Sequence, residues 1–169
     1  MSIDEFKEEV YNLATVNGRS IKKLTDLAEQ LKDEAVFLVE IIIKSIKESI
    51  PNTKLPKFYL LDSITKAVGG KYIEMFAQHI KSVYPVTFKQ SPNSVKKKLL
   101  TLFKTWYIYY PHEILNTIYN ELELSRFERE LLTPEDHKKI QGFISSKTRE
   151  ENKARPAVRQ ANPLPPPMS

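Results

Sequence analysis

The sequence predicts an all-α protein, and three of its features support that prediction. Apolar residues recur every three or four positions along most of the chain, as they do on one face of a helix. Runs that alternate apolar and polar residues, which are typical of half-buried strands, are few. Glycine occurs only four times in 169 residues. Because short connectors make successive helices antiparallel neighbours, we expect eight helices stacked pairwise into a right-handed superhelix.

Eight segments have this helical spacing, and together they cover most of the chain. They span residues 3–15, 19–32, 34–50, 55–68, 71–83, 94–109, 111–124 and 134–148. The first two segments each carry a single apolar stripe. Segment 34–50 is apolar on almost every side, which predicts the central helix of the core.

Prolines and glycines set the expected boundaries of the middle helices. Pro51 closes the third segment because proline cannot continue the hydrogen-bond ladder of a helix. Gly69 and Gly70 are a typical stop for the fourth segment. Pro85 is expected to end the fifth segment, and residues 87–94 are expected to form a loop.

Capping residues mark the expected starts of the sixth and eighth helical segments, and the signal is stronger at the eighth. Ser91 or Asn93 is the candidate cap of the sixth segment. The motif "TPED" places Thr133 at the N-cap and Pro134 at the first helical position of the eighth segment, with acidic residues in the first turn. This motif predicts a well-defined start for the eighth helix.

The composition of the chain changes near residue 150. Residues 150–169 contain five of the eleven prolines and almost no large apolar residues. Such a segment buries too little surface to offset the entropy of ordering. We therefore expect one domain over residues 1–149 and a basic, proline-rich, disordered tail over 150–169.

Composition and motifs argue against several classes of function. The chain has no cysteine, which excludes a disulfide scaffold and a thiolate metal site. It has no HExxH motif, Gly-x-Ser-x-Gly elbow or glycine-rich phosphate loop, so we expect no enzyme, metal or cofactor. The longest apolar run is interrupted by Glu40 and is too short to span a membrane. The net charge of +5 suits an anionic partner such as nucleic acid or a phosphorylated peptide.

The segment 55–68 carries a narrow polar strip on an otherwise apolar helix. Positions three and four apart share a helix face, and this relation joins Tyr59, Asp62, Ser63 and Lys66. In one interpretation, Asp62 pairs with Lys66, Ser63 bonds to its own helix, and the strip meets water. In the other, the strip lines a groove in which Asp62 accepts a hydrogen bond from a partner's hydroxyl.

Three stretches carry a resemblance to a known family. "LPKFYLLDSITKAVGGKYIEMF" resembles the signature helix pair of the RNA polymerase II CTD-interacting domains. "NGRSIKKLTDLAEQ" resembles the second helix of that family, and "KKKLLTLFKTW" resembles the helix that forms the opposite wall of its peptide groove. The similarity spans roughly residues 3–145. Its "FKTW" ending is most similar to the domain found in the cleavage, polyadenylation and termination factor subunit of the cleavage factor IA type.

This resemblance implies a fold, a ligand and a set of site residues. The fold is an eight-helix right-handed superhelix of the armadillo, VHS or ENTH type. The ligand is the heptad-repeat C-terminal tail of the largest subunit of RNA polymerase II, phosphorylated on its position-two serine and bound as a β-turn. Asp62 would accept the hydroxyl of the heptad tyrosine. The other expected contacts are Asn17, Gly18, Arg19 and Lys22 in the second helix, Tyr59, Ser63, Ile64 and Lys66 beside Asp62, and Lys98, Thr101 and Leu102 on the opposite wall.

One position departs from the pattern of the family. Phosphate-selective members carry an arginine where this chain has Thr101, and a threonine cannot make the bidentate contact of a guanidinium. Lys98 and Lys97 would supply a looser positive field. The resemblance therefore implies weak phosphate dependence. It also implies a nuclear protein that couples transcription to mRNA 3′-end processing and termination together with other processing factors.

Two other functions stay open at this point. RNA is a second candidate partner, either for the basic helix face or for the tail. The residues concerned are Lys89, Lys96, Lys97, Lys98 and Lys104 on the helices and Lys147, Arg149, Lys153, Arg155 and Arg159 toward the C-terminus. A trafficking adaptor of the VHS or ENTH type is the third candidate, although its chemistry would not need the polar strip around Asp62.

Overall fold

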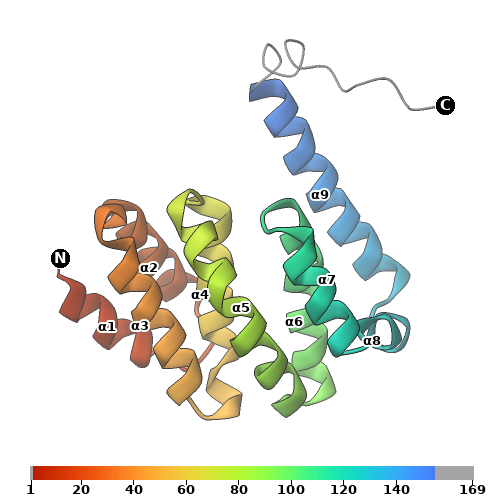
Figure 1. Ribbon diagram of the computed structural model, residues 1–169, viewed down its shortest axis with the longest axis horizontal. Coiled ribbons are helices and arrows are strands. Elements are labelled where there is room, and N and C mark those ends of the chain that lie inside the picture. The colour runs from red at the N-terminus through yellow and green to blue at the C-terminus, as the bar shows by residue number, and fades with distance from the viewer. Residues whose placement is uncertain (1, 155–169) are drawn as a thin grey trace. The chain divides into compact units, whose positions relative to one another are not determined.

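The computed structural model describes the backbone of residues 2–154 and the side chains of residues 2–150, and every regular element in that part of the chain is helical (Figure 1). The α-helices are α1 (Ile3–Tyr11), α2 (Gly18–Gln30), α3 (Ala35–Glu48), α4 (Leu55–Ala67), α5 (Lys71–Gln90), α6 (Asn93–Thr105), α7 (His112–Glu121), α8 (Leu124–Leu131) and α9 (Pro134–Ala154). Short 3-10 helices η1 (Lys32–Glu34), η2 (Pro51–Thr53) and η3 (Trp106–Ile108) follow α2, α3 and α6. The all-α prediction is confirmed.

The chain divides into two units after Leu132, and α9 lies in the second. The start of α9 has the predicted cap: the backbone N–H of Asp136 donates to Thr133 Oγ1 at 3.1 Å, and Asp136 Oδ2 accepts from the backbone N–H of Thr133 at 2.8 Å. The helix continues to Ala154, past the expected end at residue 148. Most of the expected tail, residues 155–169, lies outside the described residues.

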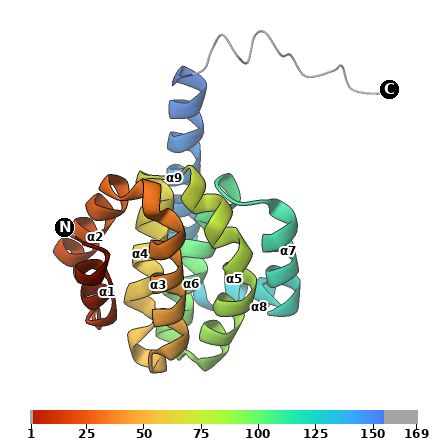
Figure 2. The same ribbon diagram turned by 60° about the vertical axis from the view of Figure 1, so that its left-hand side comes forward.

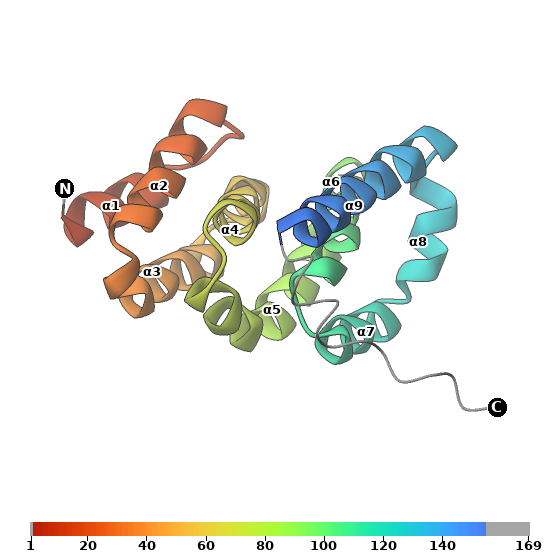
Figure 3. The same ribbon diagram turned by 90° about the horizontal axis from the view of Figure 1, so that it is seen from above.

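Helices α1 to α7 of the first unit form two rows. Seen from above, α1, α3, α5 and α7 follow one another in one row, and α2, α4 and α6 follow one another in the other (Figure 3). Neighbours within each row pack against each other. This pairwise stacking is the predicted superhelical arrangement.

The N-termini of α2, α4 and α6 lie on the same side of the row that these helices form. Residues just before α2 (14–16), at the start of α4 (55–56) and at the start of α6 (92 and 95) line one cavity. At the other end, Glu29 of α2 and Val68 after α4 line a second cavity. The three helices are therefore parallel to one another, and α4 lies between α2 and α6.

A cluster of aromatic rings fills the core beside α4. Tyr84 of α5 is fully buried, and its hydroxyl donates to the Leu99 carbonyl at 2.8 Å. Its ring meets Phe58 edge-on at 5.9 Å and Trp106 edge-on at 5.7 Å, distances at which aromatic pairs attract each other. This cluster joins α4, α5 and the end of α6.

The expected end of the fifth helix at Pro85 is wrong. Helix α5 runs through Pro85 to Gln90, so residues 87–90 are helical, and only Ser91 and Pro92 connect α5 to α6. Pro85 removes one hydrogen bond, to the carbonyl of Lys81 at an exposed position. The flanking rings of Tyr84 and Phe88 are both buried, and their packing holds the helix together.

The described residues contain nine α-helices instead of the expected eight, because α8 was missed. Glu123 adopts a left-handed backbone conformation with φ 51°, which ends α7 and turns the chain into α8. The signal for α8 is present in the sequence: Phe127 and Leu131 follow Leu124 by three and seven residues, which places all three on one helix face.

Helix α3 packs between α1 and α5 and beside α4, but it is buried on fewer sides than its composition predicts. It exposes Val36 and Phe37, which are 51% and 55% accessible, on the side away from its neighbours. Helix α4 lies between α2 and α6 and beside α3 (Figure 2). Within residues 2–154, no helix combines the length and the apolar character needed to cross a bilayer.

Candidate functional site

The carboxylate of Asp62 is the centre of the polar strip on α4. Its Oδ1 accepts a hydrogen bond from the indole Nε1 of Trp106 at 2.9 Å and an ion pair from Lys66 Nζ at 2.8 Å. The side chain of Asp62 is 12% accessible. The carboxylate therefore lies at the margin of the core, largely buried but still partly accessible to solvent.

Burial dominates the electrostatics of this carboxylate. Burial raises the pKa of Asp62 above its ordinary value, although the charge and hydrogen bond of Lys66 and the hydrogen bond of Trp106 act to lower it. The pKa of Tyr59 is raised by burial and by the charge of Asp62. A charge so poorly solvated gains more from one further hydrogen-bond donor than an exposed carboxylate does.

Hydroxyl groups join α4 to the elements on either side of it. Ser63 Oγ lies 2.8 Å from Thr25 Oγ1 of α2, and since Thr25 already donates to the Ile21 carbonyl, Ser63 is the donor. Thr65 Oγ1 lies 2.6 Å from the Tyr110 hydroxyl. Ser63 thus bonds across to α2, contrary to the interpretation in which it bonds to its own helix. The other part of that interpretation, the pair between Asp62 and Lys66, is confirmed.

The remaining predicted residues of α4 and α6 differ in their access to solvent. Tyr59, Ser63, Lys66 and Thr101 are half-buried. Ile64 is fully buried and Leu102 is 6% accessible, so both belong to the packing beneath the strip. Thr101 Oγ1 donates to the Lys97 carbonyl at 3.0 Å, one turn earlier in α6.

The start of α2 is capped by its own asparagine. Asn17 Oδ1 accepts from the backbone N–H groups of Arg19 at 3.0 Å and Ser20 at 3.2 Å, so two of the free donors of the helix are already used. The exposed Gly18 leaves open space where a side chain would be. Lys22, also exposed, pairs with Asp26 at 3.2 Å.

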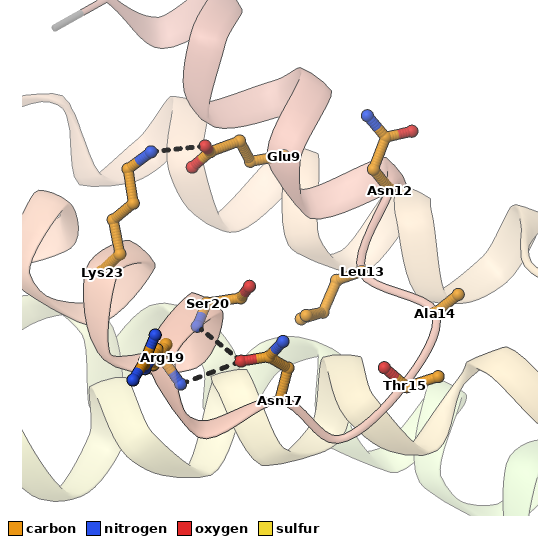
Figure 4. Close-up of a pocket in the computed structure, with 9 residues that line it drawn as sticks. All are labelled: Glu9, Asn12, Leu13, Ala14, Thr15, Asn17, Arg19, Ser20 and Lys23. Atoms are coloured by element: carbon orange, nitrogen blue, oxygen red, sulfur yellow. Dashed lines mark hydrogen bonds and ion pairs between the residues drawn. The ribbon is translucent and has the colours of Figure 1, made fainter.

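Asn17 and Arg19 line a cavity of about 430 Å³ between α1 and α2. Figure 4 shows this cavity with the segment 12–17 on one side and the ion pair between Lys23 and Glu9, 2.6 Å long, on another. Asp62 is not among the residues that line it. The structure therefore brings together Tyr59, Asp62, Ser63 and Lys66 on α4, and places Asn17 and Arg19 in a separate hollow at the start of α2.

Several lysines of the predicted basic face have partners inside the protein. Lys96 lies over the rings of Phe88 at 5.5 Å and Phe127 at 5.0 Å. Lys104 Nζ pairs with Glu128 at 2.6 Å. Lys89 and Lys98 are exposed. Lys96 and Lys104, two lysines of the expected basic helix face, therefore have partners within the protein.

The sequence interpretation missed two residues that shape the site. Trp106 is fully buried, and its N–H reaches Asp62. Thr25 is buried in α2 and holds Ser63. The only sign of these two bonds in the sequence is that Trp106 and Thr25 each place a polar atom at a core position, because a buried polar atom needs a hydrogen-bond partner.

Comparison with known proteins places this chain in a family. The family model of the CID domain matches residues 4–118, which is more than half of the chain. Protein PCF11 of Saccharomyces cerevisiae is 38% identical over 93 residues, covering 54% of this chain and 15% of that protein. Polyadenylation and cleavage factor homolog 11 of Caenorhabditis elegans is 31% identical over 104 residues, covering 60% of this chain and 13% of that protein. The chain thus matches less than a fifth of the length of these relatives.

Solved structures agree with the sequence relatives. The crystal structure of the RPR of Pcf11 superposes with a TM-score of 0.69 at 29% identity and covers 72% of this chain and 98% of that one. The CTD-interacting domain (CID) of Seb1 from Schizosaccharomyces pombe shares the fold, with a TM-score of 0.66 at 22% identity over 73% of this chain and 97% of that one. The chain belongs to the CID domain family.

Proposed function

We propose that this chain is a binding module without catalytic activity that recognises the heptad-repeat tail of RNA polymerase II. Membership of the CID family supports the ligand class, since the solved domain of Seb1 is named as CTD-interacting. The observation that carries the proposal is Asp62, a largely buried carboxylate at the margin of the core. Its Oδ1 receives the indole N–H of Trp106 and the ammonium group of Lys66.

In this proposal Asp62 accepts the hydroxyl of the heptad tyrosine through Oδ2. A phenol is a suitable donor because its ring packs on apolar neighbours while its hydroxyl reaches the carboxylate. Tyr59 and Ser63 are half-buried beside Asp62 and form the walls, with Ile64 packed beneath. The hydrogen bond to a charged acceptor contributes roughly 1.5–3 kcal/mol.

We expect phosphate on the position-two serine to contribute little. Thr101 holds the position of the missing arginine, and its hydroxyl already donates within α6. Lys98 is exposed nearby on the same helix, and Lys22 on α2 is paired with Asp26. A flexible, solvated lysine gives a weaker and less directional contact with phosphate than an arginine.

The wider role follows from what the relatives are called. One is named a polyadenylation and cleavage factor homolog, and another is PCF11. We propose a nuclear protein in which residues 1–149 link the transcribing polymerase to 3′-end processing and termination, alongside other processing factors. The segment 150–169 is proposed as a basic tail outside the binding domain.

Peptide titration tests this function. A fluorescently labelled peptide of two heptads, unmodified and phosphorylated at position two, is titrated by anisotropy against the wild-type chain. Asp62→Ala and Asp62→Asn should each weaken binding roughly tenfold to a hundredfold. Glu150→Ala is the matched control, since it removes an ion-paired carboxylate from the second unit and should leave affinity unchanged.

Two further measurements sharpen the result. Thr101→Arg should increase the preference for the phosphorylated peptide, and no gain would contradict the assignment of this wall. Circular dichroism of each variant checks that the helical content is intact. Wild-type affinity in both Asp62 variants would overturn the proposal, and RNA binding in the absence of peptide binding would favour the nucleic-acid alternative.

A further inference from the structure

The side chain of Trp106 is packed among aromatic rings at a position from which it reaches Asp62. It begins η3, directly after α6, and its side chain is fully buried. Its ring stands edge-on to Tyr84 at 5.7 Å and to Tyr110 at 5.8 Å. Its N–H donates to Asp62 Oδ1 at 2.9 Å across 44 residues of sequence.

We infer that Trp106 is a positioning residue of the proposed tyrosine site: its indole N–H fixes Asp62 through Oδ1 and directs Oδ2 to the incoming hydroxyl. This inference rests on the proposed function. It adds the residue that determines how strongly the site prefers a ligand with a hydroxyl group, such as tyrosine, over one without it, such as phenylalanine. Trp106 acts through Asp62 and has no contact of its own with the ligand in this scheme.

Lys66 alone does not supply this control. Its side chain is 19% accessible, and its ammonium group sits on a flexible stem, so it stays paired when the carboxylate rotates. The indole is planar, uncharged at every accessible pH and packed between aromatic rings. If Asp62 rotated away, the N–H of Trp106 would be buried without an acceptor, which is costly. The bond therefore favours a single orientation of Asp62.

Several ionisable groups near Asp62 affect the pKa that a titration of this carboxyl would measure. Lys66 and Tyr59 come from α4, and Tyr110 comes from the segment after η3. Trp106 adds a donor that does not titrate. Since a donor to a carboxylate favours the charged form, loss of the indole N–H should raise the pKa of Asp62.

The test compares two variants that each lose one buried hydrogen bond. Trp106→Phe keeps an aromatic ring but removes the N–H. Tyr84→Phe is the matched control: it removes the hydroxyl that donates to Leu99, on a ring that contacts Trp106 but not Asp62. Carbon-detected NMR titration of the Asp62 carboxyl in the free protein should show an upward shift of about half a pH unit or more for Trp106→Phe only.

Peptide binding supplies the second readout. Two heptad peptides are compared, one with tyrosine and one with phenylalanine in its place. The wild-type chain and Tyr84→Phe should prefer the tyrosine peptide, and Trp106→Phe should lose most of that preference. A packing role alone would weaken both peptides equally and leave the preference intact.

The outcomes separate this inference from the function on which it rests. An unshifted Asp62 pKa together with an unchanged tyrosine preference in Trp106→Phe would overturn the positioning role while leaving the proposed function in place. A wild-type chain that binds both peptides equally, or neither, would overturn the proposed function and this inference with it.

Discussion

Helices α3 and α4 pack against each other and are both strongly apolar, yet they bury polar groups in opposite ways. Helix α3 buries Ser45 completely, and Ser45 Oγ is the one fully buried side-chain polar atom in the described part of the chain that has no partner. Helix α4 buries Lys57, Asp62 and Thr65, and each has a partner on another element: Ser49, Trp106 and Tyr110.

This difference separates a structural helix from one that organises a site. The hydroxyl of Ser45 is a cost that the packing of α3 tolerates. The polar groups of α4 tie it to α2, to the end of α3 and to the segment after α6, so its position is fixed on three sides. A helix held in this way can present a carboxylate with little freedom of movement.

The largest expected effect distinguishes two phenylalanines, one on each helix. Phe58 of α4 is fully buried against Tyr84, so Phe58→Ala should lower the free energy of unfolding by about 3–5 kcal/mol. Phe37 of α3 is 55% accessible, so Phe37→Ala should change it by less than about 0.5 kcal/mol. Urea unfolding of both variants measures the difference, and similar losses would contradict the difference in burial between the two rings.

The next effect concerns a bonded hydroxyl of α4. Thr65→Val keeps the shape of the side chain but leaves the buried Tyr110 hydroxyl without its partner, which should cost about 1–3 kcal/mol. Thr117→Val, at an exposed position of α7 with only a bond to its own helix, is the control. Equal stability of the two variants in thermal unfolding would argue against a bonded network around α4.

A smaller effect of opposite sign is expected on α3. Ser45→Ala removes a hydroxyl with no partner and introduces the best helix former, so it should raise the free energy of unfolding by about 0.5–1 kcal/mol. The measurement is the same urea series. A loss of stability would show that this hydroxyl makes a bond in solution, and the contrast between the two helices would then fail.

The smallest expected effect is a pH dependence, because burial and the two donors act on the pKa of Asp62 in opposite directions. A carboxyl whose folded-state pKa is raised above the ordinary 3.8 stabilises the fold below that value and loses this contribution as the pH rises through the folded pKa. The stability of Asp62→Asn relative to wild type should therefore increase from pH 3 to pH 7. The reverse trend would mean that Lys66 outweighs burial.

Local signals in the sequence were enough to predict most of the helices. The cap at Thr133 and the stop at Gly69, whose φ is +67°, are local features, and the structure has both. The expected end of the fifth helix at Pro85 was wrong because the packing of Tyr84 and Phe88 outweighs one lost hydrogen bond. Such packing joins residues far apart in the chain, and a local pattern does not contain it.

The candidate site was predictable only in part, for the same reason. The strip on α4 follows from helical spacing, and so does the pair between Asp62 and Lys66. The bond from Trp106 and the bond between Thr25 and Ser63 join residues 44 and 38 positions apart. These bonds depend on how α2, α4 and α6 are stacked, which spacing along a single helix does not specify.

The most direct test of the account uses the single tryptophan of the chain as a reporter. Its indole N–H gives one resolved signal in a proton–nitrogen correlation spectrum, and that group is bonded to Asp62. Addition of the tyrosine heptad peptide should move this signal saturably together with the amides of α4, and the phenylalanine peptide should move it much less. An indole signal that stays in place while the peptide binds would contradict the claim that Asp62 receives the ligand.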